Sequence, residues 1–405
     1  MINARPAIAF LGAVLPDEMC SQSPACSPAA NKDVLQLIGA LRRVSNAGPS
    51  VFSVQPIAAY PKSHRILVRP SSTDLGEGIR CQMIPFINIV FFKQLTIGLA
   101  NLFCLSGWLW SHRHRSRYIL VHNVYPPMSL PVLLATKLFG GKPVALVMDL
   151  PHNMSYDFRG VRGKLQRFNL FVETRALAHF SGIIAYTRYI GEDHAPHVPM
   201  IVMEGGVDVN EVNLVPTTES ADASANERVI CYSGTLSTVN GIELLLDAFR
   251  LLPDPKYRLW IFGRGPLESL VREATQRDSR IVFFGFVPNQ IEVLRSQRRS
   301  TVLVNLRLHD KLINRYTFPS KLREYMLSAR PVISTAAPGI PEEYHEFIHI
   351  LQDETPHGLS YLLHDVCSKS PVELNEFGSR ARDFVLQTKN WTIQGRRVYE
   401  FIRKL

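Results

Sequence analysis

One segment of the C-terminal half combines the residue types that an anion-binding helix needs. Asn314–Met326 reads NRYTFPSKLREYM. Proline is favoured in the first turn of a helix, so Pro319 predicts a helix that begins near Ser320 and Lys321. The N–H groups and the positive dipole end at a helix start attract anions, and a lysine adds a full charge. Glu324 follows Lys321 by three residues and shares its helix face. The lysine can meet the phosphates of a nucleotide while the carboxylate binds its ribose, and a capped helix with an i,i+3 ion pair is the alternative.

Three glycine-containing turns precede this helix, and each follows a short apolar run. Glycine lets the backbone approach a ligand closely, and ligands of open α/β folds bind at the carboxyl ends of the strands. Each turn alone is a weak signal, because close packing would also explain its glycines. Arg264 can be interpreted either as a phosphate ligand or as a solvated loop residue. The candidate donor-binding residues at these turns are Gly234, Thr235, Gly263, Arg264, Phe286 and Val287. Backbone groups after Gly285 would bind the edge of a base, and Phe286 or Val287 would stack on it.

The elements that position these turns are short apolar runs, each followed by a helical pattern. Runs that are apolar on every side suit parallel strands covered on both faces by helices, which predicts an α/β fold. The chain has 405 residues, of which 46% are hydrophobic and 20% charged, and this length suits two domains. A polar stretch, Asn210–Asn226, separates the two series of runs. The predicted strands are Ala7–Leu11, Tyr118–His122, Val144–Val147, Gly182–Tyr186, Ile201–Met203, Val229–Tyr232, Arg258–Ile261, Ile281–Phe284, Thr301–Asn305 and Pro331–Thr335.

Together these segments resemble the retaining glycosyltransferases of family 4. The resemblance covers about residues 229–366, and the N-terminal half matches in outline only. The segments that carry it are Tyr232–Thr235, Asn240–Phe249, Ile261–Glu268, Phe284–Pro288, Phe318–Tyr325 and Ala329–Ile333. The resemblance implies the GT-B fold, in which two Rossmann-like α/β domains face each other across a cleft. It also implies an N-terminal acceptor-binding domain over residues 1–208, a nucleotide-sugar domain over 209–385 and a closing helix over 386–405 that packs back on the N-terminal domain.

The resemblance also suggests roles for particular residues. Glu324 matches the second of two glutamates that the family usually carries, and Tyr316 stands where the first would approach the donor sugar. Thr235 and Asn240 stand where an arginine and a lysine often hold the pyrophosphate. We therefore expect the phosphates to be held by Lys321 and Arg315, in a subgroup marked by the Phe-Pro-Ser-Lys run. The predicted donor contacts in this segment are Tyr316, Pro319, Ser320 and Glu324.

The N-terminal half is expected to supply one further group. The family often places a histidine after a central strand, reaching the donor, and His152 is the candidate, with Asp149 as the alternative. The expected activity is transfer of a sugar, with retention, from a nucleotide-sugar to a saccharide or lipid-linked saccharide in cell-surface polysaccharide biosynthesis. A sugar-nucleotide epimerase and a non-catalytic sugar-nucleotide-binding protein are the alternatives. Cationic side chains and helix-start amides can meet the charge of a leaving diphosphate, so we expect no metal and no cofactor.

Composition bounds the compartment and the partners. Six scattered cysteines without a CxxC pair argue against a zinc site and a disulfide framework, and fit a reducing cytoplasm. Residues 7–15 are compatible with a short signal peptide, but a first buried strand is the preferred interpretation. The net charge of +10 comes without a nucleic-acid-binding motif, so we expect phosphates of the substrate and an anionic membrane surface rather than nucleic acid.

One apolar segment predicts where that membrane contact lies. Leu95–Trp110 carries no charge and is followed at once by a cluster that ends in Arg113, Arg115 and Arg117. It is shorter than the roughly 20 residues of a spanning helix. It is either a buried helix or a helix that enters one leaflet, with Trp108 and Trp110 at the interface and the cations on lipid phosphates. We expect a peripheral protein at the inner face of the cytoplasmic membrane.

Overall fold

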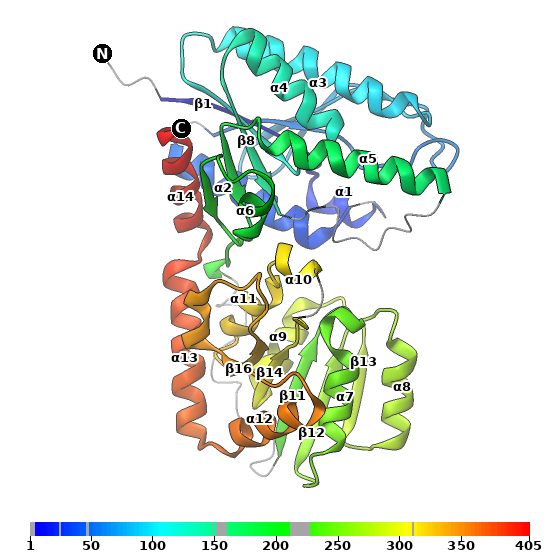
Figure 1. The fold of residues 1–405 in the computed structure, drawn as a ribbon, viewed down its shortest axis with the longest axis vertical. Coiled ribbons are helices and arrows are strands. Elements are labelled where there is room, and N and C mark those ends of the chain that lie inside the picture. Colours follow the sequence, from blue (N-terminus) through cyan, green and yellow to red (C-terminus); the bar gives the residue numbers. More distant parts are fainter. Residues whose placement is uncertain are drawn as a thin grey trace. The chain divides into compact units, whose positions relative to one another are not determined.

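The computed structural model describes residues 5–23, 26–45, 48–148, 150, 160–210, 227–309 and 312–405. His152 and Asp149 therefore lie outside the described residues, as does nearly all of the polar stretch Asn210–Asn226. The chain divides into two compact units, one formed by Met1–Gly206 with Trp391–Leu405 and the other by Val207–Asn390. The boundaries expected from the sequence are 208/209 and 385/386. Each unit is a Rossmann-like α/β domain (Figure 1).

The first unit is built on an eight-stranded sheet that is parallel except at β4. In spatial order its strands are β10 (Met200–Val202), β9 (Gly182–Ala185), β8 (Lys142–Val147), β7 (Arg117–His122), β1 (Ala7–Gly12), β2 (Ser50–Ser53), β5 (Arg80–Met83) and β4 (Ser71–Asp74). A separate antiparallel pair joins β3 (Leu67–Val68) and β6 (Phe86–Ile87). Every residue of β1 is buried, as a central strand covered on both faces requires.

The helices of the first unit are α1 (Asp17–Ser21), α2 (Pro28–Ser45), α3 (Phe92–Ser111), α4 (Pro126–Phe139), α5 (Gly160–Leu177), α6 (Tyr189–His194) and α14 (Trp391–Lys404). Figure 1 shows α3 and α4 side by side, and α14 beside α2. The contact of α14 with α2 is close enough that a Cβ on Gly395 would come within 2.6 Å of Ala40 Cβ. The C-terminal helix is thereby part of the first unit.

The second unit has a fully parallel six-stranded sheet. In spatial order its strands are β13 (Ile281–Gly285), β12 (Tyr257–Phe262), β11 (Arg228–Ser233), β14 (Val302–Asn305), β15 (Val332–Thr335) and β16 (His349–Leu351). Its helices are α7 (Ile242–Arg250), α8 (Glu268–Arg277), α9 (Gln290–Arg299), α10 (Ile313–Tyr316), α11 (Ser320–Leu327), α12 (Pro356–Ser368) and α13 (Pro371–Thr388). Buried side chains of β11, β12, β14, α7 and α12 form its hydrophobic core.

The ten predicted strands are all confirmed, with ends that differ by at most two residues. The strands β2 and β16 were missed because polar residues interrupt their apolar pattern: a serine stands at each end of β2, and a histidine begins β16. The predicted helix over Leu95–Trp110 is α3, but the membrane alternative, which places both tryptophans at the interface, is wrong for Trp108. Trp108 is buried, whereas Trp110 is exposed. None of the described helices has the length and apolar character needed to cross a membrane.

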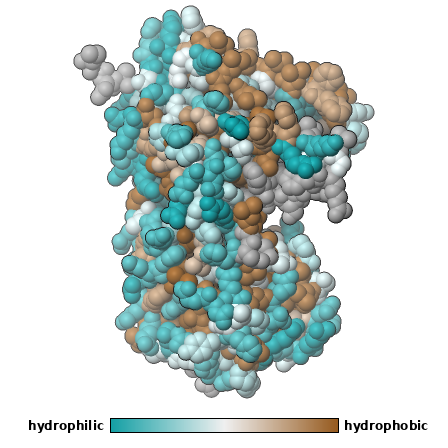
Figure 2. Space-filling model, viewed as in Figure 1, coloured by the Kyte–Doolittle hydropathy of each residue, from teal (hydrophilic) through white to brown (hydrophobic). Residues whose placement is uncertain are grey.

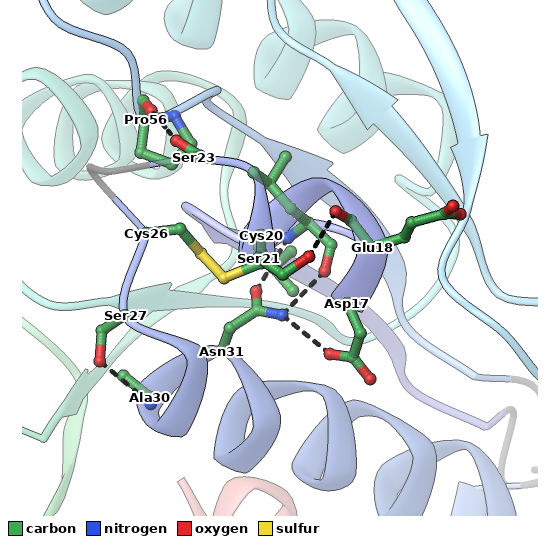
Figure 3. Close-up of a disulfide and its surroundings, with 12 residues drawn as sticks. Asp17, Glu18, Cys20, Ser21, Ser23, Cys26, Ser27, Ala30, Asn31 and Pro56 are labelled. Carbon is green, nitrogen blue, oxygen red and sulfur yellow. Dashed lines mark hydrogen bonds between the residues drawn. A yellow bond between two sulfur atoms is a disulfide. The ribbon is translucent and has the colours of Figure 1, made fainter. Parts of the chain in front are cut away.

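The scattered cysteines argued against a disulfide framework, but Cys20 and Cys26 form a disulfide (Figure 3). The chain turns after α1, where Ser23 N donates to the Cys20 carbonyl at 3.1 Å and Cys26 N donates to the Ser23 carbonyl at 3.0 Å. These turns bring the second sulfur back to the first. Asn31 of α2 fixes the neighbouring loop through hydrogen bonds with both backbone groups of Leu15. A pairing across so short a turn needs no CxxC spacing.

Candidate functional site

The three predicted glycine turns lie next to one another at the carboxyl edge of the six-stranded sheet. Gly234 N, after β11, donates to the Phe262 carbonyl at 2.8 Å, and Gly263 N, after β12, donates to the Gly285 carbonyl at 2.7 Å. The order β13-β12-β11 makes these turns neighbours in space. The backbone of three loops therefore forms one continuous surface, at the edge where ligands of parallel α/β sheets bind.

Two of these glycines are required by close contacts. A Cβ on Gly263 would lie 1.8 Å from the Gly234 carbonyl oxygen, and a Cβ on Gly234 would lie 1.4 Å from Lys321 Nζ. Both residues also have positive φ, +131° and +154°, which side chains disfavour. The space that a side chain would fill at position 234 is thus occupied by the end of the lysine.

Lys321 is held there by a hydrogen-bonded tyrosine one turn later in α11. The fully buried Tyr325 hydroxyl accepts a hydrogen bond from Ser233 N at 2.8 Å and donates one to the Ser233 carbonyl at 2.9 Å. Residues four apart share a helix face, so the bonds that attach Tyr325 to the end of β11 bring Lys321 over Gly234. Gln297 of α9 donates to the Ser233 hydroxyl at 2.9 Å and completes the support.

The surroundings of Lys321 make its charged form unfavourable. Burial, with a smaller contribution from Arg307, lowers the pKa of Lys321 to about 7, while Glu324 acts in the opposite direction. The ammonium also lies 5.2 Å from the centre of the Tyr232 ring. A cation that is partly desolvated and faces a second cation gains from the arrival of an anion.

Arg307 is a second cation of this site that the sequence analysis missed. It follows β14 and is half-buried, and its backbone is fixed by Thr335, which accepts from Arg307 N at 3.0 Å and donates to the Arg307 carbonyl at 2.7 Å. Its guanidinium donates to Asn314 Oδ1 at 3.4 Å. The signal in the sequence was an arginine two residues after a predicted strand, without the glycine that marked the other turns.

The predicted base-contacting loop holds an aromatic ring that is partly covered. The Arg264 guanidinium lies 4.4 Å from the centre of the Phe286 ring, and both side chains are exposed. Val287 follows and is half-buried. Cation–π stacking of this kind sets the orientation of the ring. In this structure Arg264 therefore contacts the aromatic residue after β13.

Asn240, which stands where the family often has a lysine, stabilises the turn after β11 through hydrogen bonds. The Thr235 side chain is exposed, and its carbonyl accepts hydrogen bonds from Asn240 Nδ2 and from the Tyr232 hydroxyl, each at 2.7 Å. Asn240 also donates to Ser237 Oγ at 3.0 Å. Asn240 thus fixes the shape of the loop, which is a structural use of that position.

The remaining predicted residues lie on α10, on α11 and immediately before it. Arg315 is half-buried and Tyr316 is buried on α10, Pro319 is the buried N-cap of α11, and Glu324 is exposed on that helix. Ser320 is the first residue of α11, and the proline before it offers no side-chain cap. The structure therefore brings together Gly234, Gly263, Lys321 and Arg307, with Glu324 on the same helix. Within the described part of the chain, no cluster of three or more His, Cys, Asp or Glu side chains is placed to hold a metal ion.

The second unit also matches a known protein family by sequence. Residues 227–363 match the family described as "Glycosyl transferases group 1". No curated protein sequence matches the chain significantly.

Similar solved structures are HepE from Anabaena in complex with UDP, sucrose-phosphate synthase from Thermosynechococcus elongatus, and the UDP-forming alpha,alpha-trehalose-phosphate synthase from Burkholderia xenovorans in complex with glucose-6-phosphate. HepE is 15% identical with a TM-score of 0.68, and the match covers 98% of this chain and all of that one. The values are 15%, 0.66, 98% and 98% for the second structure, and 11%, 0.65, 98% and 100% for the third. The chain has the GT-B fold and carries a group 1 glycosyltransferase domain, and both findings support a transferase.

We expect Gly234→Ala to destabilise the second unit by about 2–4 kcal/mol, because the new methyl group meets the lysine and the backbone has positive φ. Urea unfolding of the variant measures this cost. Gly76→Ala is the matched control, since Gly76 has φ +96° but nothing lies within 4 Å of the place that its Cβ would take. In a Lys321→Ala background the cost should fall to that of the control. An equal cost in both backgrounds would contradict the close contact.

The low pKa of Lys321 predicts that a nucleoside diphosphate binds together with a proton. Below pH 7 the free lysine is already charged, so affinity should change little there. Above pH 7 the free lysine loses its proton, and the bound diphosphate must restore it, so affinity should fall by up to tenfold per pH unit. Calorimetry of UDP binding at pH 8 in buffers of different ionisation enthalpy should show uptake of nearly one proton. Lys321→Ala should remove most of this uptake, and unchanged uptake in that variant would reject the assignment.

Proposed function

We propose that this protein is a glycosyltransferase that moves a sugar from a nucleotide-sugar donor to a saccharide acceptor with retention at the anomeric carbon, in the manner of family 4. The observation that carries the proposal is the position of the Lys321 ammonium over the Gly234 backbone, at the ligand edge of the sheet. Few structural roles account for a lysine in this place, because burial beside Arg307 opposes its charge. A diphosphate supplies the missing negative charge.

The donor is arranged along the three turns and the start of α11. The diphosphate lies against Lys321, Arg307 and the N–H groups at Ser320, while Glu324 accepts bonds from the ribose. The base lies beside Phe286 and Val287. HepE, which shares this fold, has been crystallised with UDP and with UDP-glucose. A uridine nucleotide-sugar is therefore the first donor to test.

The charges at this site act on the leaving group. As the bond between the anomeric carbon and the phosphate oxygen breaks, negative charge develops on the diphosphate, and fixed cations and helix-start amides stabilise it. The acceptor hydroxyl oxygen forms the new bond to the anomeric carbon, and its proton passes to the departing phosphate oxygen. These groups do the electrostatic work without a metal ion. Arg315 and His152 remain predicted participants, the second outside the described residues.

The acceptor is proposed to be a saccharide linked to a lipid, in the synthesis of a cell-surface polysaccharide. The enzyme would then work at an anionic membrane surface, as a peripheral protein of the inner face of the cytoplasmic membrane. The excess of cations over the whole chain, +10, is consistent with such a surface.

A non-catalytic sugar-nucleotide-binding protein is the second candidate. Two observations favour it: Tyr316 is buried where the family has a glutamate that approaches the sugar, and Asn240 braces a loop where the family has a lysine. Slow release of UDP from the donor separates the two candidates, since it requires a working site.

We expect Lys321→Ala to lower UDP release and sugar transfer by about a hundredfold or more, since loss of one such stabilising group costs roughly 3 kcal/mol. Turnover of UDP-sugars in the presence of EDTA measures it. Lys256→Ala is the matched control, because this lysine pairs with Asp254 just before β12, at the opposite edge of the same sheet. A variant within threefold of the unaltered enzyme would reject the role. Loss of the unaltered enzyme's activity in EDTA, with rescue by magnesium or manganese, would overturn metal independence.

We expect Glu324→Gln to weaken UDP binding by about tenfold, because hydrogen bonds to a charged group are worth roughly 1.5–3 kcal/mol. The effect should appear with UDP alone, since the ribose is the proposed contact. Calorimetry compares this variant with Glu376→Gln, which changes an exposed glutamate on α13. Affinity equal to the control would show that the ribose is bound elsewhere.

A further inference from the structure

The first unit exposes an apolar surface along two neighbouring helices. On α3 the exposed side chains recur every four residues, and on α4 they do the same, so each helix carries an outward apolar stripe. These side chains are 45% to 82% exposed: Leu95, Leu99, Phe103, Leu130, Leu134 and Leu138. We call this set the α3–α4 apolar face. Figure 2 shows brown atoms gathered at the upper right of the view, where Figure 1 places α3 and α4.

The side chains of this face are not needed to pack α3 against the rest of the first unit. The opposite side of α3 supplies the buried contacts, with Ile97, Leu105 and Leu109 almost fully excluded from solvent. Because α3 is apolar on both sides, core formation explains only one of them. A contiguous exposed patch on a folded domain marks a surface that is covered in use.

The charge along the two helices and the segment that joins them is of one sign. From Gly78 to Met148 the chain contains no aspartate or glutamate, and it contains seven lysines and arginines. Both helices lie within this span. The partner therefore combines an apolar phase with negative charge at its boundary.

The side chains at the end of α3 are of the kinds that lie at a boundary between an apolar phase and negative charge. Trp110 is 61% exposed, and the Arg113 guanidinium lies 5.0 Å from the centre of its ring. Arg113 and Arg115 are exposed. Arg117 serves the fold instead, since it donates to the Leu109 carbonyl at 2.9 Å. An exposed tryptophan beside arginines is the composition of a protein surface at lipid headgroups.

We infer that the α3–α4 apolar face enters the headgroup region of an anionic bilayer, with Arg113 and Arg115 on lipid phosphates. The stripes run along the helices, so both helices lie along the surface. A second copy of the chain fits less well, because a two-fold contact through this face would bring like cations together. The inference rests on the proposed function in one respect: a lipid-linked acceptor brings the enzyme to that surface.

Sedimentation with vesicles of phosphatidylcholine, with and without phosphatidylglycerol, tests the inference on the full chain. The unaltered protein should bind the anionic vesicles at least about tenfold more strongly, and salt should reduce this preference. Phe103→Glu combined with Leu134→Glu should reduce binding to anionic vesicles about tenfold or more. Arg113→Glu combined with Arg115→Glu, which alters only exposed polar side chains, should reduce it about tenfold as well.

Two control variants make the comparison specific. Tyr361→Glu with Val372→Glu changes two similarly exposed apolar side chains of the second unit, and Arg277→Glu with Arg380→Glu reverses two exposed cations there. Both should bind vesicles like the unaltered protein. Equal losses in test and control variants, or binding without preference for anionic vesicles, would overturn the inference.

Two further measurements separate the possible failures. A dimer in solution that Phe103→Glu with Leu134→Glu converts to a monomer, without vesicle binding in either form, would show that the face binds another copy and would also overturn the inference. Urea unfolding of the same variants should match that of the unaltered protein, which shows that the first unit is folded, and their UDP affinity should be unchanged. Intact UDP binding without vesicle binding rejects only the membrane surface, whereas vesicle binding without UDP binding rejects the proposed function.

Discussion

The contact between the Lys321 ammonium and the backbone of Gly234 is the constraint on which the site depends. It requires a residue without a side chain at position 234, because the lysine occupies that space. It also requires α11 to be attached to the end of β11, which the buried Tyr325 achieves through both backbone groups of Ser233. The neighbouring turn must then pass within contact distance of the Gly234 carbonyl, and Gly263 allows this.

In this arrangement the surroundings of Lys321 disfavour its charged form. Burial and Arg307 lower the pKa of Lys321 to about 7. A bound diphosphate would stabilise the charged form of this lysine. Electrostatic stabilisation is strongest where charged groups are fixed before the reaction and partly removed from water. The hydrogen bonds of Tyr325, Asn240 and Thr335 supply that rigidity: Tyr325 attaches α11 to the end of β11, Asn240 holds the loop after β11 in shape, and Thr335 attaches the backbone of Arg307 to β15.

The two units use hydrophobic residues in different ways. In the second unit they fill the core beneath the donor loops, where Tyr257 and Phe249 are wholly buried. In the first unit α3 buries one apolar side and leaves the other exposed. The proposed reaction, with a soluble nucleotide-sugar donor and an acceptor carried by a lipid, needs both an anion site open to water and a surface that meets a bilayer.

Much of this could be predicted from the amino-acid sequence because the signals are local. Parallel strands that are covered on both faces are short continuous apolar runs, so the apolar pattern alone locates ten of them, and the glycines after β11 and β12 mark the ligand edge. Long-range contacts have no such signal. Ser233 and Tyr325 are 92 residues apart, and Arg307 faces Lys321 only because β14 lies beside β11 in the sheet. The exposed side of α3 also could not be predicted, since the sequence of a uniformly apolar helix does not indicate which face its neighbours cover. Local backbone preference and apolar pattern are properties of a short segment, whereas the pKa of Lys321, the position of Arg307 and the exposure of Phe103 are properties of what packs around them, and these only the tertiary structure decided.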